Sequence, residues 1–296
     1  MSDETTPQCI WPLGAELGEG PVWNAPESAL YFVDIKGRKI HRLLVQSGRR
    51  TTWPVNGQPT FVLPLRMDGF ACGIDTALYR FSADVTPGFR LVLVVEPADN
   101  GNRLNDGYVD AQGHLWFGTM SDREVAPTGV LYQLTSNGQL FQRDHGYVIT
   151  NGPVHGLDGR TLYHTDTLKR LVYAFDLDDE GGLHNRRTFI APMEPGWPDG
   201  MALDAEGCLW VAFFGGWRID RYDPQGRLVR SVRFPCANIT KLAFGGDDLR
   251  TVYATTARKG LGPDGLAQQP LAGALFEFRS PVPGMPQFRA PHALFA

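Results

Sequence analysis

A repeat of 40 to 47 residues runs through the chain and constrains its fold more than any other feature. Each copy holds a short apolar strand, a turn rich in Gly, Asp or Asn, and a second strand that begins with a Leu-aromatic pair or a variant of one. The second strands are marked by Tyr31, Ala71, Trp116, Tyr163, Trp210 and Tyr253, of which the copy at Ala71 is degenerate. Successive markers are 40, 45, 47, 47 and 43 residues apart. A period of this length, made of short strands and turns, is typical of β-propeller blades.

Six copies therefore predict an all-β, six-bladed β-propeller with four strands per blade, forming a single domain over residues 1–296. In the first copy, period-two alternation predicts four strands, over residues 21–23, 30–34, 39–44 and 50–55.

The last copy supplies only three strands of its own. We expect the segment CIWPL, residues 9–13, to pair with them as the fourth strand, because this pairing removes a free sheet edge. The tail after Pro281 competes for the same place. Residues 258–273 form the longest irregular insertion and are expected to be a loop.

Composition restricts the classes of function. The formal net charge is −4 and the chain has no run of Lys or Arg, which argues against nucleic acid and anionic membranes as partners. No apolar stretch has the length of a membrane span, and the acidic amino terminus is unlike a signal peptide. We therefore predict a cytoplasmic protein, most simply a monomer. The four scattered cysteines are expected to be free thiols.

Counting back from each marker to the residue before the inner strand selects one polar residue per copy. These residues are Glu19, Thr60, Asp106, Asn151, Asp199 and Lys241, at distances of 12, 11, 10, 12, 11 and 12 residues. Because blades repeat by rotation about one axis, we expect the six positions to form a ring at one mouth of the central channel.

The ring is rich in oxygen donors. Three carboxylates and one carboxamide at equivalent positions repel one another unless a cation lies between them. Taken singly, an Asp or Asn before Gly is ordinary turn chemistry; their coincidence at one repeat position favours a metal site. Oxygen donors of this kind suit a hard divalent ion such as Ca²⁺, Mg²⁺ or Mn²⁺.

Five motifs in order carry a resemblance that spans essentially the whole chain: LGEGPVW, NRLNDGYVDAQGHLWFGTM, ITNGPV, PDGMALDAEGCLWVA and ARKGLGPDGLAQQP. Together they resemble the senescence-marker-protein/gluconolactonase/luciferin-regenerating-enzyme family of six-bladed propellers.

The resemblance implies a role for each matching residue. A Glu, an Asn and an Asp hold one divalent metal ion in the family, and they match Glu19, Asn151 and Asp199. Substrate contacts of the family match Arg103 and Asp122, while Asn105 matches a residue that is a substrate contact in some relatives and a metal ligand in others. The resemblance places Asp106 behind the ligands, although the spacing puts it in the ring. The ion is left open among Ca²⁺, Zn²⁺, Mn²⁺ and Fe²⁺.

The resemblance also implies a reaction, the hydrolysis of a sugar lactone to its aldonic acid in sugar oxidation. Such an enzyme is a carboxylic-ester hydrolase acting on pentono- or hexonolactones. We predict that Asp199 is both a metal ligand and the general base. Lys241 either stabilises the oxyanion or the product carboxylate as a substrate-binding residue, or only balances charge.

Two alternatives use the same scaffold: a calcium-binding regulatory protein with little catalysis, and an organophosphate hydrolase. The chain has no GxSxG or HExxH motif to support a serine or zinc hydrolase of another kind. Trp116 and Trp210 are expected in the core. The roles of Thr60, Trp197 and Trp217 stay open, with the two tryptophans either walling the substrate pocket or not.

Overall fold

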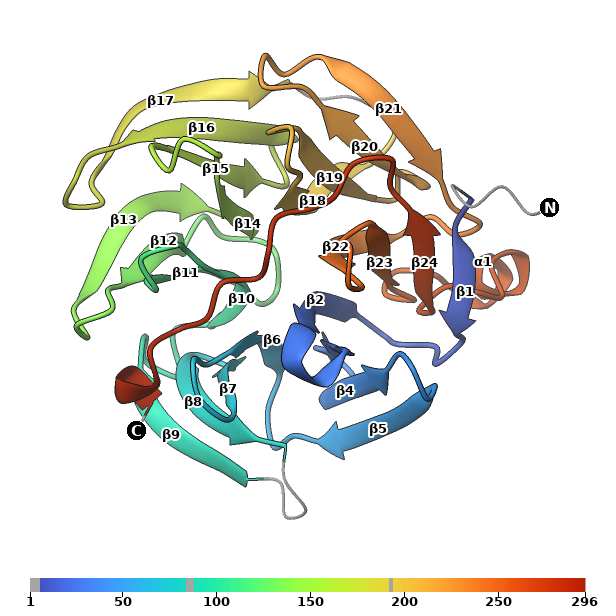
Figure 1. Cartoon of the computed structure of the whole chain (residues 1–296), viewed down its shortest axis with the longest axis horizontal. Helices are drawn as coiled ribbons and strands as arrows, with labels where there is room; N and C mark the ends of the chain where they lie inside the picture. The colour runs from blue at the N-terminus through green and yellow to red at the C-terminus, as the bar shows by residue number, and fades with distance from the viewer. Residues whose placement is uncertain (1–5, 84–87, 192–193, 296) are drawn as a thin grey trace. The chain divides into compact units, whose positions relative to one another are not determined.

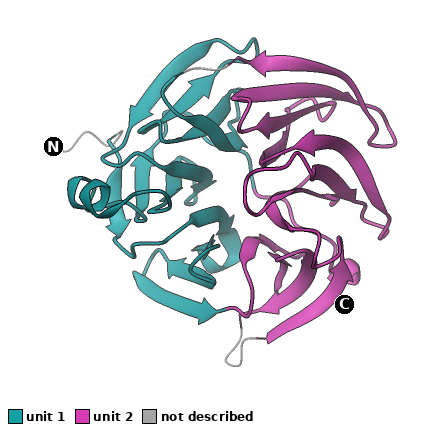
Figure 2. Cartoon of the chain, turned by 180° about the vertical axis from the view of Figure 1, so that it is seen from behind, with its two compact units in different colours: residues 1–54, 192–286 teal, residues 55–191, 287–296 magenta. Residues whose placement is uncertain are grey.

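The computed structural model describes residues 6–83, 88–191 and 194–295. They form six antiparallel sheets of four strands each (Figure 1). The fold class is a six-bladed β-propeller with four antiparallel strands per blade, as the repeat predicted. By their contacts the residues divide into two compact units, unit 1 with residues 1–54 and 192–286, and unit 2 with residues 55–191 and 287–296 (Figure 2). The assignment of residues 1–296 to one domain stays a prediction.

Unit 1 holds three of the sheets. The first is β2 (Gly18–Asn24), β3 (Ala29–Asp34), β4 (Lys39–Leu44) and β5 (Arg49–Pro54). The second is β18 (Trp197–Leu203), β19 (Leu209–Phe214), β20 (Arg218–Tyr222) and β21 (Leu228–Arg233). The third is β22 (Ile239–Gly245), β23 (Thr251–Thr256), β24 (Leu275–Arg279) and β1 (Gln8–Trp11).

Unit 2 holds the other three. The first is β6 (Pro59–Pro64), β7 (Phe70–Ile74), β8 (Ala77–Ser82) and β9 (Gly88–Val94). The second is β10 (Asn102–Val109), β11 (Leu115–Ser121), β12 (Gly129–Leu134) and β13 (Leu140–Tyr147). The third is β14 (Thr150–His155), β15 (Thr161–Asp166), β16 (Leu171–Leu177) and β17 (Leu183–Ile190). Three short helices complete the described chain: η1 (Ala25–Glu27), α1 (Pro263–Gln268) and η2 (His292–Phe295). None of the helices in the described residues has the length and hydropathy to cross a membrane.

The strands β2, β6, β10, β14, β18 and β22, here called the leading strands, are largely buried. Every residue of β2, β6 and β22 is buried, whereas the last strands β5, β9 and β21 are largely exposed. Within unit 1, β22 contacts both β2 and β18; within unit 2, β10 contacts both β6 and β14. The apolar cores of each unit therefore lie between neighbouring sheets, as expected for sheets packed face to face.

The closing strand is where the sequence placed it. β1 pairs antiparallel with β24, with Gln8 opposite Glu277 and Cys9 opposite Phe276. The tail does not compete for this edge. Residues 283–285 bond to β18 and the turn after it, through Met285 N to Leu203 O (3.1 Å) and Ala205 N to Pro283 O (2.9 Å).

One local prediction was wrong. The insertion at residues 258–273 was expected to be a loop but contains α1, which starts with Pro263, a residue suited to the first turn of a helix. The polar residues before Gly107 belong to β10, which begins at Asn102. A bulge between Leu104 and Gly107 interrupts the alternation there, so the segment does not show the pattern of a strand.

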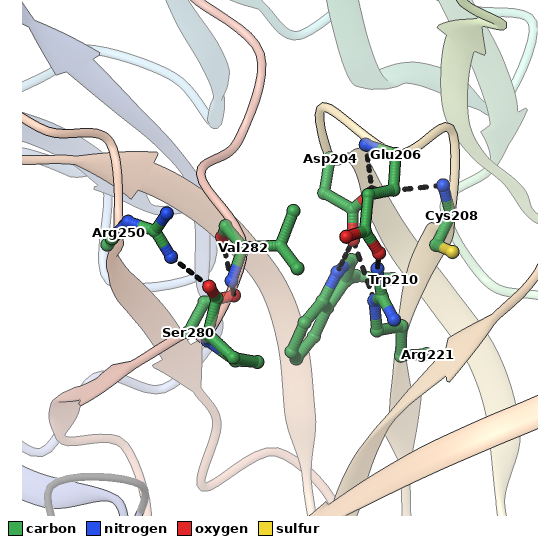
Figure 3. A network of polar contacts seen from close by, with 9 residues as sticks. Asp204, Glu206, Cys208, Trp210, Arg221, Arg250, Ser280 and Val282 are labelled. Atoms are coloured by element: carbon green, nitrogen blue, oxygen red, sulfur yellow. Dashed lines mark hydrogen bonds and ion pairs between the residues drawn. The ribbon is translucent and has the colours of Figure 1, made fainter.

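Aspartates hold the turns between the first two strands of two blades. Asp204 Oδ1 accepts hydrogen bonds from the backbone N–H groups of Glu206 and Cys208, and Asp204 Oδ2 accepts one from Trp210 Nε1 (Figure 3). Asp110 bonds in the same way to the N–H groups of Gln112 and His114 and to Trp116 Nε1. Trp116 and Trp210 are fully buried, which confirms their prediction as core residues. All four cysteines are free thiols.

Candidate metal and substrate site

The pairing of strands identifies equivalent positions in the six blades independently of sequence counting. The marker residues pair with Val22, Leu63, Tyr108, Val154, Ala202 and Ala243 on the leading strands. The residue three positions before each partner lies at or within a bulge of the strand pair. These residues are Glu19, Thr60, Asn105, Asn151, Asp199 and Thr240. A bulge changes where side chains point at the end of a strand, and bulges are frequent beside functional sites.

Two positions obtained by counting shift by one residue. The register places Asn105 rather than Asp106 at the position equivalent to Glu19, and Thr240 rather than Lys241. At Lys241 the reason is that the hairpin to the marker is longer than in the other blades, so a count along the chain does not preserve the register. At Asp106 the count selected the residue directly before a glycine, whereas the register-equivalent Asn105 lies two residues before Gly107. The shift at Asn105 agrees with the resemblance.

In unit 2 the predicted polar residues meet in one network. Arg103 Nε donates to Asp122 Oδ1 (2.9 Å), and Arg103 Nη1 donates to Asn105 Oδ1 (2.6 Å). Asn105 Nδ2 in turn donates to Asn151 Oδ1 (2.9 Å), and Asn151 Nδ2 donates to Thr167 Oγ1 (2.9 Å). The network fixes the orientation of both amides. In each amide the oxygen accepts one hydrogen bond and the nitrogen donates another, so a flip of the amide would break both.

The Arg103 side chain is almost wholly buried, and its charge is balanced by Asp122, whose side chain is 33% exposed. A buried charge that lost this partner would be strongly destabilising. Gln58 Nε2 lies 3.4 Å from Asp122 Oδ2 and donates a further hydrogen bond to it. The pair thus presents a hydrogen-bonding cation and a partly exposed carboxylate next to the two amides.

Asp106 acts on the backbone. Its Oδ1 accepts from Gly107 N (2.7 Å), and its Oδ2 accepts from Gly152 N (2.8 Å). Gly152 directly follows Asn151, so the carboxylate of Asp106 fixes the bulge of the neighbouring leading strand. This contact fits a supporting position behind Asn151.

In unit 1, Glu19 and Asp199 are buried at the bulges of β2 and β18. The strand β22 contacts both neighbours. Thr240 Oγ1 donates to Gly18 O (2.6 Å), the residue before Glu19. The stem of Lys241 runs over Gly200, the residue after Asp199, since a Cβ at Gly200 would come within 2.4 Å of Lys241 Cγ. Gly200 is therefore required for this approach.

The residues fit a hard divalent cation. Glu19, Asp199 and Asn151 supply only oxygen donors, and each is buried in its unit. An amide oxygen has two acceptor sites, so the bond from Asn105 to Asn151 Oδ1 leaves one for a cation. No three side chains of His, Cys, Asp or Glu gather to hold a metal in the part of the chain that the structure describes. The predicted ligand set has only two carboxylates, those of Glu19 and Asp199, so the amide oxygen of Asn151 is needed as the third protein ligand.

Thr60, whose role the sequence left open, has a structural partner. Its buried hydroxyl donates to Gly73 O (3.4 Å). Sequence reasoning did not find Gln58 and Thr167, because neither stands in a motif and each reaches the site from a different strand or loop.

The comparisons with known proteins agree with this architecture. Residues 17–258 match the model of the SMP-30/gluconolactonase/LRE-like region. Regucalcin of Oryctolagus cuniculus is 35% identical, over 95% of this chain and 97% of its own. The 6-deoxy-6-sulfogluconolactonase of Pseudomonas putida is 32% identical, over 94% and 96%. The crystal structure of the calcium-binding protein regucalcin from Agrobacterium tumefaciens str. C58 superposes with a TM-score of 0.90 at 27% identity, covering 97% of each chain.

The fold, six sheets of four antiparallel strands with buried polar residues in the leading strands, defines the class of the protein as a six-bladed β-propeller. The chain belongs to the SMP-30/gluconolactonase/LRE-like family.

Proposed function

We propose that this protein hydrolyses the lactone of an aldonic acid, a pentono- or hexonolactone, with the help of one divalent metal ion. The observation that carries the proposal is the set of oxygen donors at the register-equivalent bulge position: Glu19, Asn105, Asn151 and Asp199. Membership of a family that includes a named sulfogluconolactonase supports the reaction class. We further propose a monomer that acts on a small molecule.

Each residue has a part in this proposal. Glu19, Asn151 and Asp199 would hold the ion, which when bound supplies a Lewis acid for the lactone carbonyl and acidifies water. The Asp199 carboxylate accepts the proton of the attacking water as general base. Lys241 stabilises the negative charge that develops on the carbonyl oxygen or the product carboxylate.

The polyol would be oriented by the unit 2 network. The Arg103 guanidinium is a planar group of N–H donors, and its bonds to Asp122, Leu104 O and Asn105 hold it in one orientation. Asp122 is partly exposed and accepts from sugar hydroxyls. A rigid donor and acceptor pair of this kind positions a polyol without a large ordering cost.

The test is metal removal followed by reconstitution. Exhaustive chelation should abolish hydrolysis of aldonolactones, and addition of Ca²⁺, Zn²⁺, Mn²⁺ or Fe²⁺ should restore it, with spontaneous lactone opening subtracted. Asp199→Asn should lower kcat by ~10²-fold or more, the size expected for loss of a general base. Glu19→Gln should weaken metal affinity. Asp264→Asn, on the surface helix α1, is the matched control and should change neither. Full activity in chelated protein would overturn the proposal.

A second candidate is a calcium-binding regulatory protein with little catalysis. The names of the relatives favour it, since one solved structure is described as the calcium-binding protein regucalcin. Tight Ca²⁺ binding by calorimetry, together with no turnover on a panel of lactones, would support this function over the first.

A further inference from the structure

Two Gly-Trp pairs in unit 1 meet at their glycines. A Cβ placed on Gly196 would lie 2.7 Å from Gly216 Cα, so the two backbones touch at this point. Gly196 also has a φ of +97°, a conformation that other residues adopt only with strain. Trp197 follows the first glycine and Trp217 follows the second. The contact therefore brings two tryptophans from different segments to the same place.

Both tryptophans are unusually exposed. Trp197 is 37% exposed and Trp217 is 38% exposed, whereas Trp23, Trp116 and Trp210 are buried. An indole left in water forgoes a large gain from burial, and exposed aromatic side chains on rigid supports are typical of binding surfaces. One edge of the Trp197 ring rests on the turn at Gly215, where a Cβ would come within 3.3 Å of Cζ3.

The supporting segments are held by hydrogen bonds. Trp217 N donates to Ala237 O (3.0 Å), and Phe234 N donates to Trp217 O (3.0 Å). The buried Arg218 donates from Nη1 to Pro195 O (2.6 Å) and from Nε to Asp220 Oδ2 (2.7 Å). Arg218 thus ties the segment before Trp197 to the strand after Trp217. A surface fixed in this way binds a ligand with little loss of conformational entropy.

The pair lies next to the proposed general base. Trp197 and Asp199 belong to the same strand, β18, two residues apart, and two residues of strand span about 7 Å. Asp199 is buried, while Trp197 is in contact with solvent. A ligand that reaches the Asp199 carboxylate therefore has Trp197 about one sugar ring away along the same strand.

The chemistry of the surface selects the ligand. The face of an indole is a negative π surface that attracts the weakly positive C–H groups on the apolar face of a pyranose. We propose that Trp197 and Trp217 form a stacking subsite for a second sugar ring, so that the substrate class includes aldonolactones bearing a glycosidically linked sugar. The inference rests on the proposed lactonase function and extends its substrate.

The kinetic test compares gluconolactone with the lactone of cellobionic acid. Trp197→Ala and Trp217→Ala should each lower kcat/KM for the disaccharide lactone about 10-fold, through KM, a size typical of one aromatic stacking contact. The same variants should change kcat/KM for gluconolactone less than about 3-fold. Trp197→Phe, which keeps a π face, should recover most of the loss. Leu228→Ala, an exposed apolar residue of the same blade, is the control and should alter neither substrate.

A binding test separates this inference from the lactonase proposal. Cellobiose titrated into metal-free protein should change the intrinsic tryptophan fluorescence, and the Trp197→Ala/Trp217→Ala double variant should lose that response. Two results would overturn the subsite and leave the lactonase proposal intact. In the first, the tryptophan variants hydrolyse both lactones as well as the wild type does. In the second, they lose kcat/KM equally for both lactones. A fluorescence response without hydrolysis of any lactone would overturn the lactonase and keep the sugar subsite.

Discussion

The buried histidine of β15 makes the stability of the protein depend on pH. His164 has no solvent exposure, and neither ring nitrogen has a hydrogen-bond partner among the described residues. The ring packs edge-on against Tyr147, with centroids 4.8 Å apart. Burial lowers the pKa of His164 from 6.5 to about 3; Asp144 opposes this shift and Arg186 adds to it. The folded protein therefore holds this histidine neutral.

The sign of the effect follows from proton binding. Between pH 6.5 and about 3 the unfolded chain binds a proton at His164 that the folded chain does not. The unfolding free energy is therefore unaffected by this group above pH 6.5 and decreases as the pH falls below 6.5. We predict that His164→Leu reduces the decrease in unfolding free energy between pH 7 and pH 4.5 by about 2 kcal/mol. Urea titrations at the two pH values measure it. The exposed His145→Leu is the control. Equal pH dependence in wild type and His164→Leu would contradict the prediction.

At the candidate site, the residue types were predictable and their register was not. The sequence placed Glu19, Thr60, Asn151 and Asp199 at the positions that strand pairing makes equivalent. It missed Asn105 by one residue because the count selected the residue directly before a glycine, Asp106, whereas the register places Asn105 at this position. The bond from Asp106 to Gly152 N joins two blades, and no pattern within one repeat encodes a contact between repeats.

At the scale of the element, the aspartates Asp110 and Asp204 stabilise the turns of two hairpins. Asp204 is fully buried and accepts four hydrogen bonds, from two backbone N–H groups, Trp210 Nε1 and Arg221 Nε (2.7 Å) (Figure 3). We predict that Asp204→Ala destabilises the protein by about 3 kcal/mol, because Arg221 loses its buried partner and the indole N–H loses its acceptor.

The comparison that checks this is Asp178→Ala. Asp178 forms the same turn through Glu180 N and Gly182 N, but its side chain is largely exposed and bonds to no buried tryptophan. Chemical denaturation should show a clearly smaller loss for Asp178→Ala. Similar losses for both variants would mean that the turn alone, and not the buried bonds, carries the stability.

The sequence predicted the regular strands well and the irregular elements poorly, because only the strands have a local periodic signal. The four strands expected in the first repeat agree with β2 to β5, because alternation and turn residues are local signals. The six-residue α1 is too short for helical periodicity to be visible. The starts of β10 and β14 were hidden by bulges, which place polar residues at positions where alternation predicts none.

At the scale of the whole molecule, both units are discontinuous in sequence. Unit 1 combines residues 1–54 with 192–286, and unit 2 combines residues 55–191 with 287–296. Strand β1 therefore pairs with β24, and Ala290 forms an isolated bridge with Leu65, so both segments join parts of the chain that are far away in sequence. Contacts of such long separation slow folding, since the loop must close before they form.

Residues 287–295 are accordingly predicted to stabilise unit 2. Ala290 N donates to Pro64 O (3.0 Å), Arg66 N donates to Ala290 O (2.9 Å), and Phe295 is fully buried in the same apolar cluster as Phe61 and Leu104. Phe295→Ala should lower the unfolding free energy by about 3 to 5 kcal/mol, the range for a phenylalanine removed from a core. Phe141→Ala, a partly exposed phenylalanine of unit 2, should cost much less. Hydrogen exchange should locate the loss of protection in β6 and β10. Unchanged exchange there, or equal losses for the two variants, would show that the tail only covers a core that is stable without it.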